Sequence, residues 1–151
     1  MWFKKEKMNG LYIQKTVYSA FCGTGKSWLC SKKPNLFVEV EGWKYQDGDF
    51  PDNCIQDIEK GLCTNKKVLI DTNPVVLKKL FQSGIKIKLF YPKNNLKSKY
   101  INNFIDRGSS KDFIELLNKN WDKWIDELKD QQYCEQIILD DEEYLELFLD
   151  D

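Results

Sequence analysis

Short apolar runs rich in β-branched and aromatic residues alternate with amphipathic helical patterns along most of this 151-residue chain. The alternation is typical of an α/β fold with a mainly parallel sheet, because parallel strands need a crossover segment between them. The length fits a single domain over residues 1–151. We expect five strands, at residues 16–21, 36–41, 67–71, 85–91 and 137–139.

The expected helices fall between these strands. They start near residue 26 and then cover residues 52–62, 74–83, 95–106 and 109–128, with a last one packed by residues 144–149. Asp52 or Asn53 would cap the second helix, and Pro74 suits the first turn of the third. Ser109 and Asp112 have the spacing of a capping box. Acidic residues at 140–143 would favour the start of the last helix.

The charge pattern excludes several function classes. The chain has 23 basic and 24 acidic residues and no histidine, which rules out Ser-His-Asp triads and His-ligated zinc. With a net charge of -1, a nucleic-acid partner is not expected. No apolar run is long enough to cross a bilayer, so no membrane partner is expected. Five cysteines without a C-x-x-C pair and no secretory leader favour reduced thiols in the cytoplasm.

The strongest chemical signal is the segment 20–27, which reads A-x-x-x-x-G-K-S between an expected strand and an expected helix. It is one glycine short of the strict phosphate-loop pattern. Glycines let successive backbone N–H groups face one anion, Lys26 would reach the outer phosphates, and Ser27 would ligate magnesium. The phosphate-binding residues expected are Cys22, Gly23, Thr24, Gly25, Lys26 and Ser27.

Two carboxylates end apolar runs, where open α/β sheets gather ligand groups at the carboxyl edge. Glu41 follows the second expected strand and would hold metal-bound water or an acceptor. Asp71 follows the third and would act as a carboxylate near magnesium. Each is also a common kind of solvated loop residue. Trp121 and Trp124 are expected in the core, whereas Trp43 lies in a polar loop and could stack on a base.

Four segments together resemble a known family. They are Ser19-Ala-Phe-Cys-Gly-Thr-Gly-Lys-Ser27, Phe50-Pro-Asp-Asn53, Arg107-Gly-Ser-Ser110 and Asn120-Trp-Asp-Lys-Trp-Ile-Asp-Glu-Leu128. In this order they resemble small phage-type P-loop nucleotide kinase-like proteins, related to deoxynucleoside monophosphate kinases. The resemblance implies a three-layer α/β/α P-loop fold, ATP as phosphoryl donor, Mg²⁺ and a nucleoside monophosphate as acceptor.

The resemblance also implies a lid-like segment over about residues 95–110. Within it, Arg107 would move onto the transferring phosphoryl group. The chain departs from the family pattern after the second and third strands, where Glu41 and Asp71 stand. It also has a single arginine, and its lid lysines lack the fork geometry of a guanidinium.

Three functions stay open at this level. The first is an ATP-dependent kinase for nucleoside or deoxynucleoside monophosphates, in which Lys26, Arg107 and Glu41 serve catalysis and Ser27 and Asp71 serve the metal. The second is a degenerate nucleotide-binding or protein-interaction module with a regulatory or phage–host role, motivated by the scarcity of arginine. The third is an NTPase that uses water as acceptor. A homodimer or a protein partner fits each of them, in the cytoplasm, or in the host cytoplasm if the chain is phage-encoded.

Overall fold

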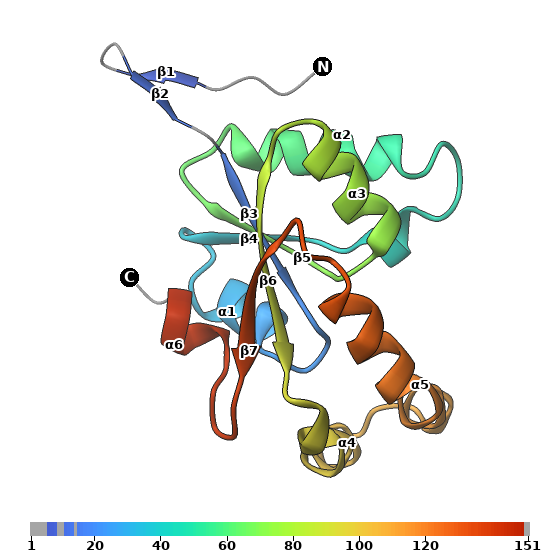
Figure 1. The fold of residues 1–151 in the computed structure, drawn as a ribbon. Coiled ribbons are helices and arrows are strands. Elements are labelled where there is room, and N and C mark those ends of the chain that lie inside the picture. The colour runs from blue at the N-terminus through green and yellow to red at the C-terminus, as the bar shows by residue number, and fades with distance from the viewer. Residues whose placement is uncertain (1–5, 9–10, 14, 150–151) are drawn as a thin grey trace.

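A parallel sheet forms the centre of the computed structural model, which describes residues 6–8, 11–13 and 15–149 (Figure 1). Its strand order is β4-β5-β3-β6-β7. The strands are β3 (Thr16–Ala20), β4 (Phe37–Val40), β5 (Lys67–Ile70), β6 (Lys86–Pro92) and β7 (Glu135–Leu139). Each neighbouring pair is parallel, which confirms the predicted mainly parallel five-stranded sheet. The central position of β3 places the loop that follows it in the middle of the sheet edge.

Helices cover both faces of the sheet, as the three-layer prediction requires (Figure 1). On one face α1 (Lys26–Lys32) and α6 (Leu145–Leu149) contribute to one apolar cluster. On the other, α2 (Asp52–Leu62), α3 (Pro74–Gln82), α4 (Lys97–Asp106) and α5 (Lys111–Lys129) contribute to a larger one. Successive strand residues point to opposite faces, so Val68 and Ile70 join the larger cluster while Leu69 joins the smaller. Burial on both faces explains why these strands are almost continuously apolar.

Four short elements complete the described chain. Strands β1 (Glu6–Met8) and β2 (Leu11–Ile13) pair with each other in antiparallel fashion, a ladder that the sequence patterns did not indicate. The segments η1 (Gly42–Tyr45) and η2 (Asn94–Leu96) are single 3₁₀ turns. The first lies in the expected loop after β4, and the second precedes α4, so α4 begins two residues later than predicted.

Helix caps agree with the sequence only in part. Asn73 caps α3, where its side chain accepts from the Val75 amide at 3.0 Å, and Pro74 takes the first turn as predicted. The cap of α5 is Ser110 rather than Ser109, and its hydroxyl accepts from the Phe113 amide at 3.1 Å. Because the cap lies one residue later, Asp112 no longer has capping-box spacing.

The predicted cap of α2 is also wrong. The N-cap residue is Pro51, whose side chain makes no capping hydrogen bond, and Asn53 within the first turn accepts from the Cys54 amide at 2.8 Å. Asn53 also donates to the carbonyls of Tyr45 and Asp47, each at 3.1 Å. The Asn53 side chain therefore ties the loop that precedes α2 to the first turn of that helix.

Strand β6 has β3 on one side and β7 on the other, although the lysines of its sequence are typical of a strand near a sheet edge. Lys86 and Lys88 lie 3.5 and 3.8 Å from Glu135 on β7. The neighbouring strand thus provides the counter-charge, which lets a lysine-bearing strand lie inside the sheet.

No helix in the described part of the chain combines the length and apolar character that a bilayer crossing requires.

Trp121 is the largest side chain fully buried in the core, as predicted for this position. Its ring centroid lies 5.4 Å from that of Phe21 and 5.6 Å from that of Tyr100, and its indole N–H donates to the Asn94 carbonyl at 2.9 Å.

We expect Trp121→Ala to lower the free energy of unfolding by about 3–5 kcal/mol in urea titrations. The control Leu116→Ala, on the exposed side of the same helix, should cost under about 1 kcal/mol. Equal losses for the two variants would contradict this packing.

Candidate functional site

The loop after β3 is a tight turn that contains two glycines with left-handed backbone. Gly23 and Gly25 have φ angles of 84° and 108°, a left-handed region that other residues rarely adopt. The Thr24 hydroxyl donates to the Phe21 carbonyl at 2.7 Å, and the Thr24 carbonyl accepts from the Leu145 amide at 3.0 Å. The buried Thr24 therefore fixes the loop shape from inside and ties it to α6.

Lys26 points inward and is only 9% exposed. Its ammonium donates to the carbonyl of Ala20, at the start of the loop, at 2.8 Å. Burial lowers the pKa of Lys26, and the negative side chains of Glu39, Asp71 and Glu41 act in the opposite direction. The Lys26 side chain is thus turned to the inner side of the loop and held at the end of β3.

A first pocket, here called the α4 pocket, lies between the loop and α4 and has a volume of about 280 Å³. A side chain at position 23 would come within 3.1 Å of the rings of Phe104 and Tyr100, so Gly23 fits closely under α4. Nothing lies within 4 Å of the same position on Gly25, which faces open space. The buried Tyr100 hydroxyl has no hydrogen-bond partner among the described residues.

Arg107 lines the α4 pocket together with both loop glycines. It ends α4, and its guanidinium carbon lies 4.2 Å from the ring centroid of Phe104. The structure therefore brings the arginine and the loop of the sequence prediction to one pocket. Tyr100 and Phe104 on the same helix are buried, so a lid motion of α4 as a whole would expose two aromatic rings.

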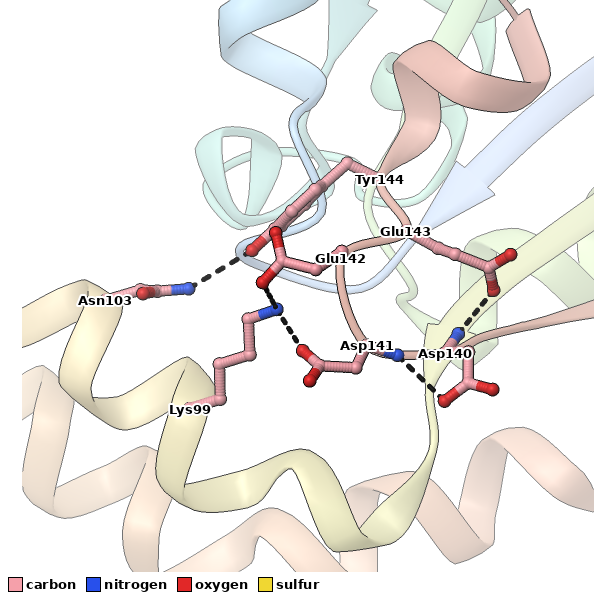
Figure 2. A network of polar contacts seen from close by, with 7 residues as sticks. All are labelled: Lys99, Asn103, Asp140, Asp141, Glu142, Glu143 and Tyr144. Atoms are coloured by element: carbon pink, nitrogen blue, oxygen red, sulfur yellow. Dashed lines mark hydrogen bonds and ion pairs between the residues drawn. The ribbon is translucent and has the colours of Figure 1, made fainter.

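A network of polar contacts fixes α4 against the loop that follows β7 (Figure 2). Lys99 binds both Asp141 and Glu142, the latter at 3.0 Å, and its ammonium lies 5.5 Å from the ring centroid of Tyr144. The Asn103 amide donates to the Tyr144 hydroxyl at 3.4 Å. Tyr144 thereby becomes a further wall of the α4 pocket.

The acidic residues after β7 lie just before α6, which begins at Leu145. Asp140 forms an ion pair with Lys93 at 2.9 Å, and the two residues after it bind Lys99. These acidic side chains therefore form ion pairs with one lysine before α4, Lys93, and one lysine in α4, Lys99.

A second pocket, here called the acidic pocket, has a volume of about 470 Å³ and lies beside the other flank of the loop. Lys26 and Cys22 border it from the loop, and three carboxylates border it from the ends of β4 and β5 and from α5. These are Glu41, Asp71 and Glu127. Aromatic side chains supply much of the remaining wall: Phe21, Trp43, Phe113 and Trp124.

Asp71 occupies the floor of this region. Its carbonyl accepts from the Ser19 hydroxyl at 2.8 Å, and a side chain at position 42 would come within 3.2 Å of its Oδ1. Oδ1 is buried and has no hydrogen-bond partner among the described residues. Burial raises the pKa of Asp71, while the Gly42 amide and the Lys26 charge act to lower it.

The carboxylate nearest Ser27 is Glu39, which sequence reasoning missed. The Ser27 hydroxyl donates to Glu39 at 3.1 Å, and the nearby Glu41 carboxyl group acts to raise the pKa of Glu39. The signal was present, because residues two apart on a strand share a face and E-x-E ends β4. Ser27 and Glu39 provide the oxygen ligands that Mg²⁺ prefers. No group of three or more His, Cys, Asp or Glu side chains suited to a metal occurs among the described residues.

The structure thus places the predicted residues around one loop, but it divides them between two pockets on either side of that loop. Arg107 lies at the α4 pocket, Glu41 and Asp71 lie at the acidic pocket, and Ser27 faces Glu39. Trp124 is only partly buried and lines the acidic pocket together with the exposed Trp43. Burial raises the pKa of Cys22 to about 11, so this loop cysteine is a neutral thiol. Tyr144, Glu127 and Trp124 reach the site only through tertiary packing, which their spacing in the sequence does not reveal.

No protein-family model matches this chain, and no curated protein matches it in sequence.

The carboxyl pair on β4 generates a prediction about stability. Burial, together with the Glu41 carboxyl group, raises the pKa of Glu39 from 4.5 to about 7. Because the folded protein holds this proton more tightly than the unfolded chain does, Glu39 stabilises the fold most at low pH, and the contribution is lost as pH rises from about 4.5 through about 7. Glu39→Gln should therefore flatten the fall in melting temperature between pH 5 and 8, measured in EDTA without nucleotide. Glu115→Gln, exposed on α5, should leave the profile unchanged; a flat wild-type profile would contradict the shift.

Proposed function

We propose that this chain is an ATP-dependent phosphotransferase of the nucleotide-kinase type, which transfers the γ-phosphoryl group of MgATP to a nucleoside-containing acceptor. One observation carries the proposal: the glycine-rich loop is a shared wall between two pockets. Gly23 and Gly25 border the α4 pocket, whereas Cys22 and Lys26 border the acidic pocket. A phosphoryl group held at the loop would have donor atoms on one side and acceptor atoms on the other.

In this proposal the α4 pocket takes the donor. The aromatic rings of Tyr144 and Trp28 line it, and such rings hold a purine base by stacking. The polyphosphate would then follow the loop past the open face of Gly25 toward Lys26. Phosphoryl transfer depends mainly on positioning and on neutralising negative charge, and Lys26 and Arg107 are the cations placed beside the loop.

The acidic pocket takes the acceptor. Its aromatic walls suit a base, and Glu41 and Asp71 are hydrogen-bond acceptors for a reacting hydroxyl. The nucleoside monophosphate expected from the sequence is one member of this acceptor class. Ser27 and Glu39 would hold magnesium, and the ion would supply positive charge that offsets the charge of the phosphates. With ATP as its donor, the activity belongs in the cytoplasm, or in the host cytoplasm if the chain is phage-encoded.

The test is ADP formation from MgATP with panels of nucleosides and nucleoside monophosphates. Lys26→Met keeps the buried aliphatic volume but removes the charge, so it should lower kcat by at least about 10²-fold while the protein stays folded. Lys78→Met, on the exposed side of α3 and away from both pockets, is the matched control. Tight MgATP binding without transfer to any acceptor would favour the nucleotide-binding module instead, and ATP consumption without any acceptor would favour the NTPase.

A comparison of alanine variants at two serines of α1 distinguishes a role in metal binding from a general effect on this helix. Ser27→Ala removes the hydroxyl next to Glu39, and we expect the Mg²⁺ concentration for half-maximal activity to rise about 10- to 100-fold. Ser31→Ala, one turn further along the helix and exposed, should leave it unchanged. The measurement is a magnesium titration of initial rates at saturating ATP, and equal titrations for both variants would remove Ser27 from the metal site.

A further inference from the structure

We propose that the acceptor is a nucleoside, an uncharged hydroxyl compound with an aromatic base, and that a nucleoside monophosphate is selected against. This inference rests on the proposed kinase function and specifies its substrate. It follows from the charges, the hydrogen-bonding capacity and the walls of the acidic pocket.

The charges of the pocket oppose a second phosphate. Glu41, Asp71 and Glu127 line it, and Lys26 is the one cation among the described residues that do so. The Lys26 ammonium already donates to the Ala20 carbonyl and lies in the loop, where the donor phosphates would take it. A monophosphate carries a charge of about -1.5 to -2 at pH 7, so it would enter a partly buried space in which carboxylates predominate.

Two other cations, Lys44 and Arg107, do not offset the excess of carboxylates in the acidic pocket. Lys44 lies 3.4 Å from Glu41, which it partly neutralises, but its side chain is 58% exposed and it does not line the pocket. Arg107 lines the α4 pocket and packs on the Phe104 ring. The acidic pocket therefore lacks the guanidinium fork that recognises a phosphate in a fixed orientation.

The same carboxylates favour an acceptor substrate that carries a free hydroxyl group. An ionised carboxylate only accepts hydrogen bonds, so it selects ligand groups that donate them. Glu41 and Asp71 place such acceptor groups on the pocket wall, where a sugar hydroxyl would donate to them. Trp43 is 65% exposed and lies with Trp124 along the pocket, which gives a base flat apolar surfaces to pack on.

The reaction then has a defined balance. The acceptor hydroxyl oxygen forms a bond to the γ-phosphorus of ATP, and the bond from that phosphorus to the β–γ bridging oxygen breaks. ADP leaves with that electron pair, and the hydroxyl proton passes to the Asp71 carboxylate. The products are ADP and a nucleoside monophosphate, so the reaction that consumes the product would be a second phosphorylation carried out by another enzyme.

The experiment compares each ribo- and deoxyribonucleoside with its own 5′-monophosphate, using the full chain, MgATP and chromatographic detection of the phosphorylated product. We expect kcat/KM for the best nucleoside to exceed that for its monophosphate by at least tenfold. A preference for monophosphates would overturn the inference and leave the kinase proposal standing. Transfer to neither class would overturn both.

A charge reversal tests the electrostatic cause directly. Glu127→Lys places a cation at the mouth of the pocket on an exposed helix position, and it should raise kcat/KM for monophosphates relative to nucleosides about tenfold. Glu115→Lys makes the same change on the same helix away from the pocket and should leave the ratio unchanged. Equal ratios in both variants would show that the carboxylates do not set the selectivity and would overturn the inference.

Discussion

The buried ammonium of Lys26 is the feature on which the rest of the site depends. Removing a lysine charge from water is costly, and the loop offsets this through the Ala20 carbonyl and through nearby carboxylates on β4 and β5. Those strands lie beside β3 or one strand further, so their carboxyl ends reach the loop together. Sheet order and charge placement are therefore parts of one arrangement, in which the fold holds the Lys26 side chain at the wall of the acidic pocket.

Helix α4 divides the space around that cation. Its aromatic residues pack into the core and under Gly23, while Lys99 and Asn103 bind the loop after β7 (Figure 2). Exposed ion pairs of this kind contribute little to stability on their own. Their effect here is geometric, because they bring Tyr144 to the pocket that Arg107 lines. The acidic pocket lies on the other flank, and its carboxylates give it a different preference for ligands.

The sheet and the loop could be predicted because their signals are local. Strand 16–20 and the glycines after it are read from apolar runs and from turn chemistry, and both agree with the structure. Strand β6 carries lysines that are typical of an edge strand, but it lies inside the sheet because Glu135, on a strand far along the chain, provides the opposite charge. Glu39 was overlooked for a similar reason. Its importance comes from Ser27, which lies twelve residues earlier and approaches it only when α1 packs beside β4.

The sequence by itself determined the alternation of strands and helices, the glycine-rich loop and the scarcity of guanidinium groups, because each of these is a property of consecutive residues or of composition. Only the tertiary structure decided which carboxylate meets Ser27, which aromatic rings line each pocket and where the single arginine points. Such contacts join residues from separate elements, and their geometry depends on strand order and helix packing rather than on local propensity. The charge of the acidic pocket is the clearest case, since its carboxylates come from β4, β5 and α5 and meet only in the folded chain.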